Sequence, residues 1–176
     1  LSDLLLTPDK LSIENLKKEG IQDSKIKFVG NIMIDTLESN RDQAANMEIY
    51  KIIEDNLIDG QTTNNGHPEL VEWRRTINNK YALMTMHRPS NVDKKEILEP
   101  IIRFLLDEVT NDMCIYWPVH PRTQKQLQNF GLWKELMQNQ KIVLLSPLGY
   151  HEMLKLNLEA KIMLTDSGGL QEECTV

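Results

Sequence analysis

Near the C-terminal end of the chain, residues 162–173 read IMLTDSGGLQEE. Three apolar residues in succession, Ile162 to Leu164, predict a buried strand, and the Gln-Glu-Glu run at 171–173 predicts the opening of a helix. A strand that turns into a helix through glycines leaves backbone N–H groups free at the positive end of the helix dipole, where a phosphate can bind. A Ser-Gly-Gly turn is equally compatible with a simple tight connection, so this stretch alone leaves both interpretations open.

The composition is typical of a globular protein and excludes several classes of function. The 176 residues are 40% hydrophobic and 26% charged, with a formal net charge of -6. An acidic chain is not expected to bind nucleic acid non-specifically, and no apolar run approaches the roughly 18 residues of a membrane span. Cys114 and Cys174 have no recognisable spacing, which favours a reduced, cytoplasmic setting. Because the chain begins without methionine and stops within a motif, we expect it to be a piece of a longer protein.

Strand-like and helix-like segments alternate along the chain, which predicts an α/β fold. We expect strands near residues 1–6, 25–29, 81–86, 113–117, 141–145 and 162–164. Helices are expected near residues 11–18, from 32 onward, and over 49–57, 93–109, 123–130 and 151–158. Residues 59–68 are polar and turn-rich and predict an exposed loop that contains His67. Right-handed crossovers would make the last four strands a parallel sheet with helices on both faces.

Charged and polar residues follow each of the last four predicted strands. Since ligands bind outside the carboxyl ends of such strands, we expect these residues to share one edge of the sheet. They are His87, Arg88, His120, Arg122, Tyr150 and Ser167 with its two glycines. Arginine offers bidentate hydrogen bonds to phosphate, and histidine exchanges a proton near neutral pH, so the set suits a diphosphate or a carboxylate. The alternative is that His87 and His120 only cap strand ends.

Other familiar chemistries lack their motifs. His151-Glu152 begins like a zinc motif, but position 155 is lysine where a second histidine is needed. Asp166-Ser167-Gly168 lacks the preceding glycine of a serine-hydrolase elbow. The chain contains neither the glycine pattern of nicotinamide-binding folds nor a phosphate-binding loop with Gly-Lys-Ser/Thr. We therefore expect no metal and no cofactor.

Four motifs occur in order: TMHRPSN at 85–91, PVHP at 118–121, PLGY at 147–150 and TDSGGLQEE at 165–173. With these motifs, and with the upstream segments 15–21 and 29–35, the chain resembles the UDP-N-acetylglucosamine 2-epimerase family, and the non-hydrolysing type in particular. The resemblance covers most of the chain except the loop around residues 56–70. It implies a two-domain GT-B-type fold, which many nucleotide-sugar glycosyltransferases share. Residues 1–30 would end the first Rossmann-like domain, 31–72 would hold a crossover helix and an irregular loop, and 73–176 would form most of the second, nucleotide-binding domain.

The resemblance also implies how the nucleotide would be held. Ser167, Gly168 and Gly169 would bind the UDP phosphates, as the helix-start reasoning also suggests. Glu173 would hydrogen-bond the ribose hydroxyls. The backbone near Met153, after Tyr150 at the start of the same helix, would meet the uracil.

The remaining implied roles belong to the reacting centre. His87 would lie near the diphosphate and assist the departure of UDP. Arg88 and His120 would line the domain cleft, where some members bind a second, activating substrate molecule. Asn91 is implied as a further substrate contact. Many members have glutamate where this chain has Ser90, which puts a contact from that position to an activating ligand in doubt.

The family's reaction interconverts UDP-N-acetylglucosamine and UDP-N-acetylmannosamine by anti elimination of UDP and its re-addition with C2 inverted. The resemblance places the acidic residues that move the C2 proton in the first domain, so we expect this chain alone to be inactive. It also implies a cytoplasmic homodimer, with no nucleic-acid or membrane partner. Two alternatives stay open: a UDP-sugar-dependent glycosyltransferase of the same GT-B fold, and a nucleotide-sugar sensor without catalysis.

Overall fold

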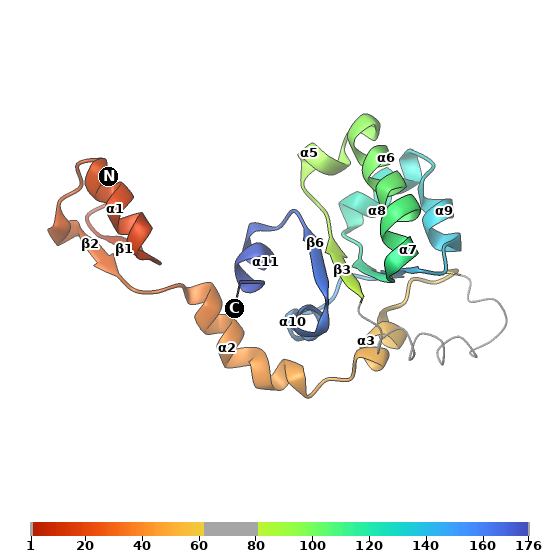
Figure 1. The fold of residues 1–176 in the computed structure, drawn as a ribbon, viewed down its shortest axis with the longest axis horizontal. Coiled ribbons are helices and arrows are strands. Elements are labelled where there is room, and N and C mark those ends of the chain that lie inside the picture. The colour runs from red at the N-terminus through yellow and green to blue at the C-terminus, as the bar shows by residue number, and fades with distance from the viewer. Residues whose placement is uncertain (1, 62–80, 176) are drawn as a thin grey trace.

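The computed structural model describes residues 2–61 and 81–175, which form two parallel sheets joined by a long helix (Figure 1). The smaller sheet pairs β1 (Leu5–Thr7) with β2 (Ile26–Phe28), in a register that sets Leu5 opposite Ile26. Between these strands run α1 (Lys10–Lys18) and the short 3-10 helix η1 (Asp23–Lys25). Gly20 follows α1 with φ of +85°, a left-handed conformation that ends the helix at the predicted glycine.

The connection between the two sheets is helical. The Asn31 side chain accepts a hydrogen bond from the backbone N–H of Met33 at 3.0 Å and so caps α2 (Ile32–Ala45). After a short link comes α3 (Ile49–Asn56). The inner face of α2 buries Leu37 and Ala44 against Leu154 of a later helix, which fixes α2 along the second sheet.

The larger sheet contains β3 (Ala82–Thr85), β4 (Ile115–Pro118), β5 (Ile142–Leu145) and β6 (Ile162–Thr165). All three pairings are parallel, and the order across the sheet is β5-β4-β3-β6. The chain therefore steps outward from β3 to β5 and then returns to the other side of β3. This reversal is the topological switch point of the fold.

Helices cover both faces of this sheet, as predicted. On one face lie α5 (Pro89–Val92), α6 (Lys95–Phe104), α8 (Pro121–Asn129) and α9 (Trp133–Gln138). A π-helical segment, η2 (Leu105–Val109), and α7 (Thr110–Asp112) continue α6. On the other face lie α3 and α10 (Tyr150–Glu159), and α11 (Gly168–Glu173) follows β6.

The core follows the two-residue period of the strands. Ala82, Ile115 and Trp117 pack with the α6 and α8 layer, whereas Leu83 and Tyr116 pack with α3 and α10. All of these side chains are fully buried, because a parallel sheet covered on both faces exposes neither set to water.

Several boundaries differ from the prediction. The short helices α5 and α9 were not expected, and the helix predicted at residue 123 begins at Pro121, because His120 caps it. The predicted loop at 59–68, including His67, lies mostly outside the described residues, and the boundary proposed at 72–73 lies wholly outside them. Within the described ranges, no helix combines the length and the apolar character needed to cross a bilayer.

Candidate active site

The carboxyl ends of β3 and β6 meet at the switch point. The register sets Thr85 opposite Thr165, and their hydroxyl oxygens lie 2.7 Å apart. The Thr165 hydroxyl also accepts a hydrogen bond at 3.0 Å from the backbone N–H of Ser167. These bonds align the loop after β3, which carries His87, with the turn after β6, which carries the Ser-Gly-Gly sequence.

The carboxylate of Asp166 joins these two loops. It accepts hydrogen bonds from the backbone N–H of Arg88 at 2.8 Å, from that of His87 at 3.0 Å and from the Asn91 side chain at 3.1 Å. The side chain of Asp166 is only 10% exposed. Burial raises the pKa of this carboxyl, but the hydrogen bonds outweigh burial and hold the pKa below its ordinary value.

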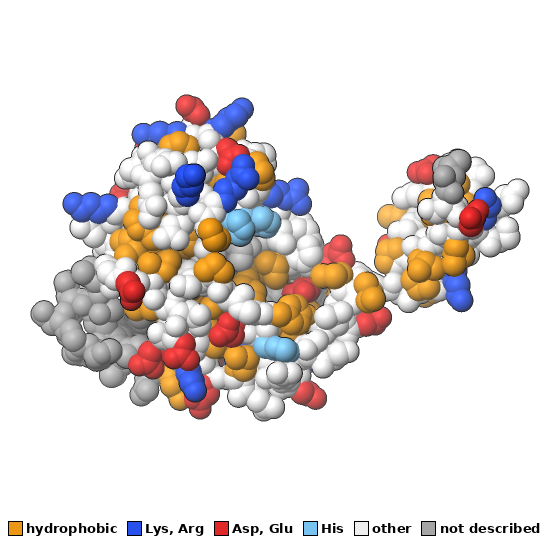
Figure 2. Space-filling model, turned by 180° about the vertical axis from the view of Figure 1, so that it is seen from behind, with side chains coloured by type: hydrophobic (Ala, Val, Ile, Leu, Met, Phe, Trp, Pro, Cys, Tyr) orange, Lys and Arg blue, Asp and Glu red, His pale blue; other side chains and the backbone are white. Residues whose placement is uncertain are grey.

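The two predicted histidines face the same site. The centres of the His87 and His120 rings are 5.7 Å apart, with 39° between their planes. Nδ1 of His87 lies 3.1 Å from the Asp166 carboxylate. Nδ1 of His120 accepts a hydrogen bond of 3.1 Å from the backbone N–H of Arg122, so this ring caps the start of helix α8 (Pro121–Asn129), whereas the alternative predicted from the sequence was a cap of a strand end. Figure 2 shows one face of the molecule, on which histidine side chains lie beside hydrophobic and basic ones.

A cavity of about 220 Å³ opens between these loops. Four residues predicted for the site line it: His87, His120, Met153 and Ser167. The rest of the lining is mostly apolar and comes from the ends of β3, β4 and β5 and from α11: Thr85, Met86, Pro118, Pro147, Leu148 and Leu170. An apolar hollow with a few convergent polar groups is typical of a ligand site.

Arg88 and the two glycines lie beside this cavity. A Cβ built on Gly168 would be 3.9 Å from the Arg88 guanidinium, so the cation lies close to the start of α11. A Cβ built on Gly169 would be 3.4 Å from the terminal methyl of Met33 in α2. The backbone at 168–169 is therefore accessible next to a positive charge, which suits an anion.

Arg122 is not available for this site, contrary to the prediction that it shares the ligand-binding edge. Its Nε donates to the Asp93 carboxylate at 2.8 Å, and Gln126 donates to the same carboxylate at 3.3 Å. The hydrogen bond from Arg122 lowers the pKa of Asp93. The pair ties the end of α5 to α8, and hence the His87 loop to the His120 loop.

Tyr150 and Glu173 form a pair that sequence reasoning did not connect. Glu173 is buried, with 7% of its surface exposed, and its carboxylate accepts a hydrogen bond from the Tyr150 side chain. Burial raises the pKa of Glu173 even though this hydrogen bond opposes the shift. Burial and the neighbouring carboxylate also raise the pKa of Tyr150.

Asp166 is the residue whose importance sequence reasoning missed. It was quoted within the TDSGGLQEE motif without a role. The signal was available in the predicted topology, because a carboxylate that directly follows one parallel strand meets the loop that follows its neighbour.

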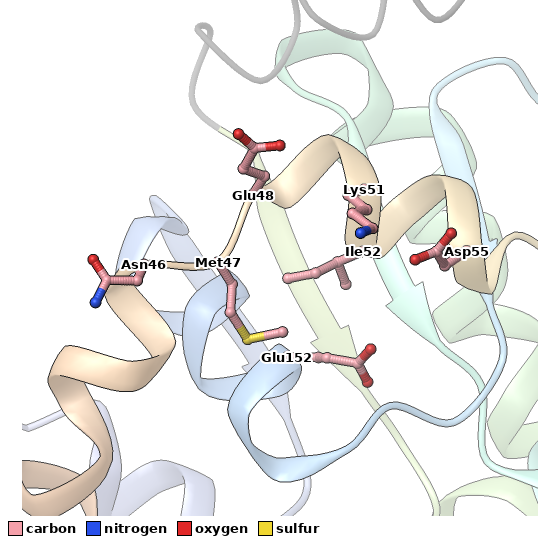
Figure 3. A pocket seen from close by; sticks show the side chains of 7 residues that line it. All are labelled: Asn46, Met47, Glu48, Lys51, Ile52, Asp55 and Glu152. Carbon is pink, nitrogen blue, oxygen red and sulfur yellow. The ribbon is translucent and has the colours of Figure 1, made fainter.

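A second cavity, of about 350 Å³, lies between the end of α2, α3 and α10 (Figure 3). Its lining is of mixed charge: Asn46, Met47, Glu48, Lys51, Ile52, Asp55 and Glu152. Glu152 is already engaged, since it accepts a hydrogen bond of 2.8 Å from the backbone N–H of Gly149. None of the predicted site residues lines this cavity. In the part of the chain that is described, no cluster of three or more His, Cys, Asp or Glu residues is arranged to hold a metal ion.

Comparison with known proteins agrees with the resemblance. The family described as UDP-N-acetylglucosamine 2-epimerase matches residues 1–176. The chain belongs to this family. Two curated members, from the archaea Methanococcus maripaludis and Methanocaldococcus jannaschii, are 35% and 34% identical to it over its whole length. This epimerase-family chain spans 43% of the length of each.

A solved structure extends the likeness to the fold. The crystal structure of the M. jannaschii UDP-GlcNAc 2-epimerase in complex with UDP-GlcNAc and UDP is 34% identical and superposes with a TM-score of 0.76. It matches 98% of this chain and 42% of its own length. The predicted α/β fold with parallel strands, and its place in a GT-B-type architecture, are thereby confirmed.

Proposed function

We propose that the protein to which this chain belongs interconverts UDP-N-acetylglucosamine and UDP-N-acetylmannosamine. The observation that carries the proposal is the cavity at the switch point, because His87, His120 and Ser167 line it together in a member of the epimerase family. Family membership supports the reaction, and the convergence of imidazole and backbone N–H groups supports its location.

The diphosphate would bind at the start of α11. The first N–H groups of a helix have no partner within the helix, so those of Gly168 and Gly169 can point at phosphate oxygens. The Arg88 guanidinium beside Gly168 supplies the opposing charge. Asn91 contributes through its contact with Asp166, which holds the loop that carries Arg88.

The nucleoside would bind next to α10. Glu173 would accept hydrogen bonds from the ribose hydroxyls, and its raised pKa reflects a buried carboxyl that such donors would stabilise in the charged form. The Tyr150 hydroxyl, which donates to Glu173 in the structure, would share the carboxylate with the ribose. Met153 lines the cavity from the first turns of α10, where the backbone would meet the uracil.

The chemical step would be an elimination. The C2–H bond of the sugar breaks and its electron pair forms the C1=C2 double bond of a glycal, while the C1–O electron pair leaves with UDP. His87 would donate a hydrogen bond to the departing diphosphate and so stabilise the charge that develops there. Re-addition of UDP, with a proton returned to the opposite face of C2, inverts that centre.

The C2 proton requires a base, and Asp166 is poorly suited to that role. Hydrogen bonds already occupy its oxygens, and its pKa lies below the ordinary value. We propose that carboxylates of the first domain, beyond the 43% of the relatives that this chain matches, move the proton. We also propose that the whole protein is a cytoplasmic homodimer.

A turnover assay tests the proposed reaction. With the whole protein and UDP-N-acetylglucosamine alone, we expect proton NMR to show UDP-N-acetylmannosamine forming without an acceptor, whereas the 176-residue chain alone should give no product. His87→Asn should lower kcat by about 100-fold or more, the usual contribution of a positioned acid or base. His151→Asn is the matched control, because the His151 ring contacts Asn40 at 2.7 Å and does not line the cavity.

The alternatives give different results in the same assay. A requirement for an acceptor would identify a glycosyltransferase and overturn the proposed reaction. Binding of the nucleotide sugar without turnover by the whole protein would identify a sensor. Product formed by the isolated chain would overturn the assignment of proton transfer to the first domain.

A further inference from the structure

Both carboxylate oxygens of Asp166 contact the loop that carries His87. One oxygen, Oδ2, accepts from the backbone N–H of Arg88 at 2.8 Å and from Asn91 at 3.1 Å. The other, Oδ1, lies 3.1 Å from the backbone nitrogen and 3.1 Å from Nδ1 of His87. The backbone bonds fix the main chain on either side of the His87 Cα, and the contact with Nδ1 fixes the ring.

We propose that Asp166 is a positioning residue that holds His87 with its proton on Nδ1 and leaves Nε2 to the cavity; this inference rests on the proposed function of His87. A carboxylate at this distance stabilises a proton on the nearer ring nitrogen and repels a lone pair there. Within residues 2–61 and 81–175, Nε2 of His87 has no hydrogen-bond partner, and the side chain lines the cavity. The ring nitrogen available to a ligand is therefore Nε2.

His120 is held in the opposite tautomer. Its Nδ1 accepts the backbone N–H of Arg122 at 3.1 Å, so the proton of the neutral ring is on Nε2. With ring centres 5.7 Å apart, neutral His87 offers an acceptor at Nε2 and neutral His120 a donor at Nε2. When His87 takes up a proton, Asp166 balances the charge of the imidazolium, and its Nε2–H can donate to a leaving phosphate oxygen. The site thus contains one nitrogen that exchanges a proton and one fixed donor.

The tautomers are measurable without substrate. We expect two-dimensional ¹H–¹⁵N NMR of the ¹⁵N-histidine-labelled chain at alkaline pH to show Nδ1–H for His87 and Nε2–H for His120. His87→Asn and His120→Asn assign the signals. An Nε2–H tautomer for His87 in the unmodified chain would overturn the proposal.

Asp166→Asn sharpens the test. The amide oxygen is expected to replace Oδ2, which accepts from the backbone N–H groups of His87 and Arg88 and from Asn91. The NH2 group then faces Nδ1 of His87 and donates to it. The His87 tautomer should then reverse to Nε2–H, while that of His120 stays unchanged. Asp9→Asn is the matched control, because Asp9 also accepts a backbone N–H, from Ser12 in the first turn of α1, and should leave both tautomers as they are. A His87 tautomer that survives Asp166→Asn in a folded chain would also overturn the proposal.

The whole protein provides the kinetic readout. Asp166→Asn should lower kcat by about 100-fold with a much smaller change in KM, and Asp166→Glu should recover part of kcat because it restores the charge. A loss confined to KM would overturn a role through His87. NMR separates the positioning role of Asp166 from the proposed function. If the chain shows the expected tautomers but does not bind UDP, the proposed function is contradicted and the role of Asp166 still holds.

Discussion

Gly169 is the second residue of α11, and in the proposed function its backbone N–H binds a UDP phosphate. A Cβ there would meet only the flexible Met33 methyl, at the ordinary contact distance of 3.4 Å. We therefore predict that Gly169→Ala leaves the free energy of unfolding unchanged or raises it by up to ~1 kcal/mol, since alanine favours a helix. UDP affinity, measured by calorimetry, should fall about tenfold, or ~1.4 kcal/mol, because the methyl group separates the phosphate from the backbone.

Gly131 is the control, because a substitution there should change stability and not UDP binding. Its φ is +76°, which an L side chain rarely adopts, and nothing lies within 4 Å of an added Cβ. Gly131→Ala should lower the free energy of unfolding by about 1 kcal/mol and leave UDP affinity unchanged. Wild-type affinity in Gly169→Ala, or loss of affinity in Gly131→Ala, would contradict the placement of the phosphate.

We expect the Glu173 carboxylate to lower the stability of the folded chain but to strengthen UDP binding. Because its pKa is raised in the folded chain, the folded state binds the proton more tightly than the unfolded state. Stability is then lost as pH rises from the ordinary pKa through the raised one. Glu173→Gln should therefore raise Tm at pH 7, and the gain should vanish below about pH 4.

Binding should change in the opposite direction. An amide is a weaker acceptor than a carboxylate for the ribose hydroxyls, so Glu173→Gln should bind UDP less tightly. Calorimetry at neutral pH measures this affinity. A variant that is less stable than the wild type at pH 7, or that binds UDP equally well, would contradict the role given to Glu173.

Single residues also show what sequence can and cannot predict. His87, His120 and Ser167 were expected at one edge because each follows a strand of a parallel sheet, and they line one cavity. Arg122 satisfied the same rule but pairs with Asp93, an acid outside the four motifs. The edge of the sheet at which a residue lies can be predicted from the alternation of strands and helices. The partner of a charged side chain depends on which side chains of other elements lie within hydrogen-bond distance in the folded chain.

Among the elements, α2 depends on α10 for its attachment to the larger sheet. Lys155 of α10, 11% exposed at its side chain, donates to the backbone carbonyl of Ala45 at 2.8 Å. Lys155→Ala should lower the free energy of unfolding by about 1–3 kcal/mol, because it leaves this carbonyl unpaired at the end of α2. Urea denaturation measures the change.

Lys95 is the matched control for this prediction. It forms an i,i+4 ion pair with Glu99, as Lys155 does with Glu159, but it lies on the surface. Lys95→Ala should change the free energy of unfolding by no more than about 0.5 kcal/mol. Equal effects of the two substitutions would show that the hydrogen bond to α2 contributes nothing.

Helices and strands could be predicted where the segment was long enough for its pattern of apolar residues to indicate one type of element. The four strands of the larger sheet are uninterrupted apolar runs, and all four are present. The helices α5 and α9 have four and six residues, too few to show a helical period in the sequence. The start of α8 was misplaced because Pro121 suits the first turn of a helix as well as a loop.

At the scale of the whole molecule, the strand order β5-β4-β3-β6 brings motifs that are far apart in the sequence to one edge of the sheet. The return of the chain to β6 sets the Ser-Gly-Gly turn beside the His87 loop, and Asp166 joins the two. The fold class was predictable from the alternation of elements, but the strand order was not, because sequence gives no sign of the side of β3 on which β6 lies. The chain spans 43% of the length of two curated relatives, and the reaction proposed above is a proposal for the longer protein.

A titration of the ¹⁵N-histidine-labelled chain with UDP tests this account most directly. We predict that the imidazole signals of His87 and His120 shift together along one saturating curve, because both rings line the cavity that would hold the diphosphate. Saturation by UDP with both signals unmoved, or no binding of UDP at all, would contradict it.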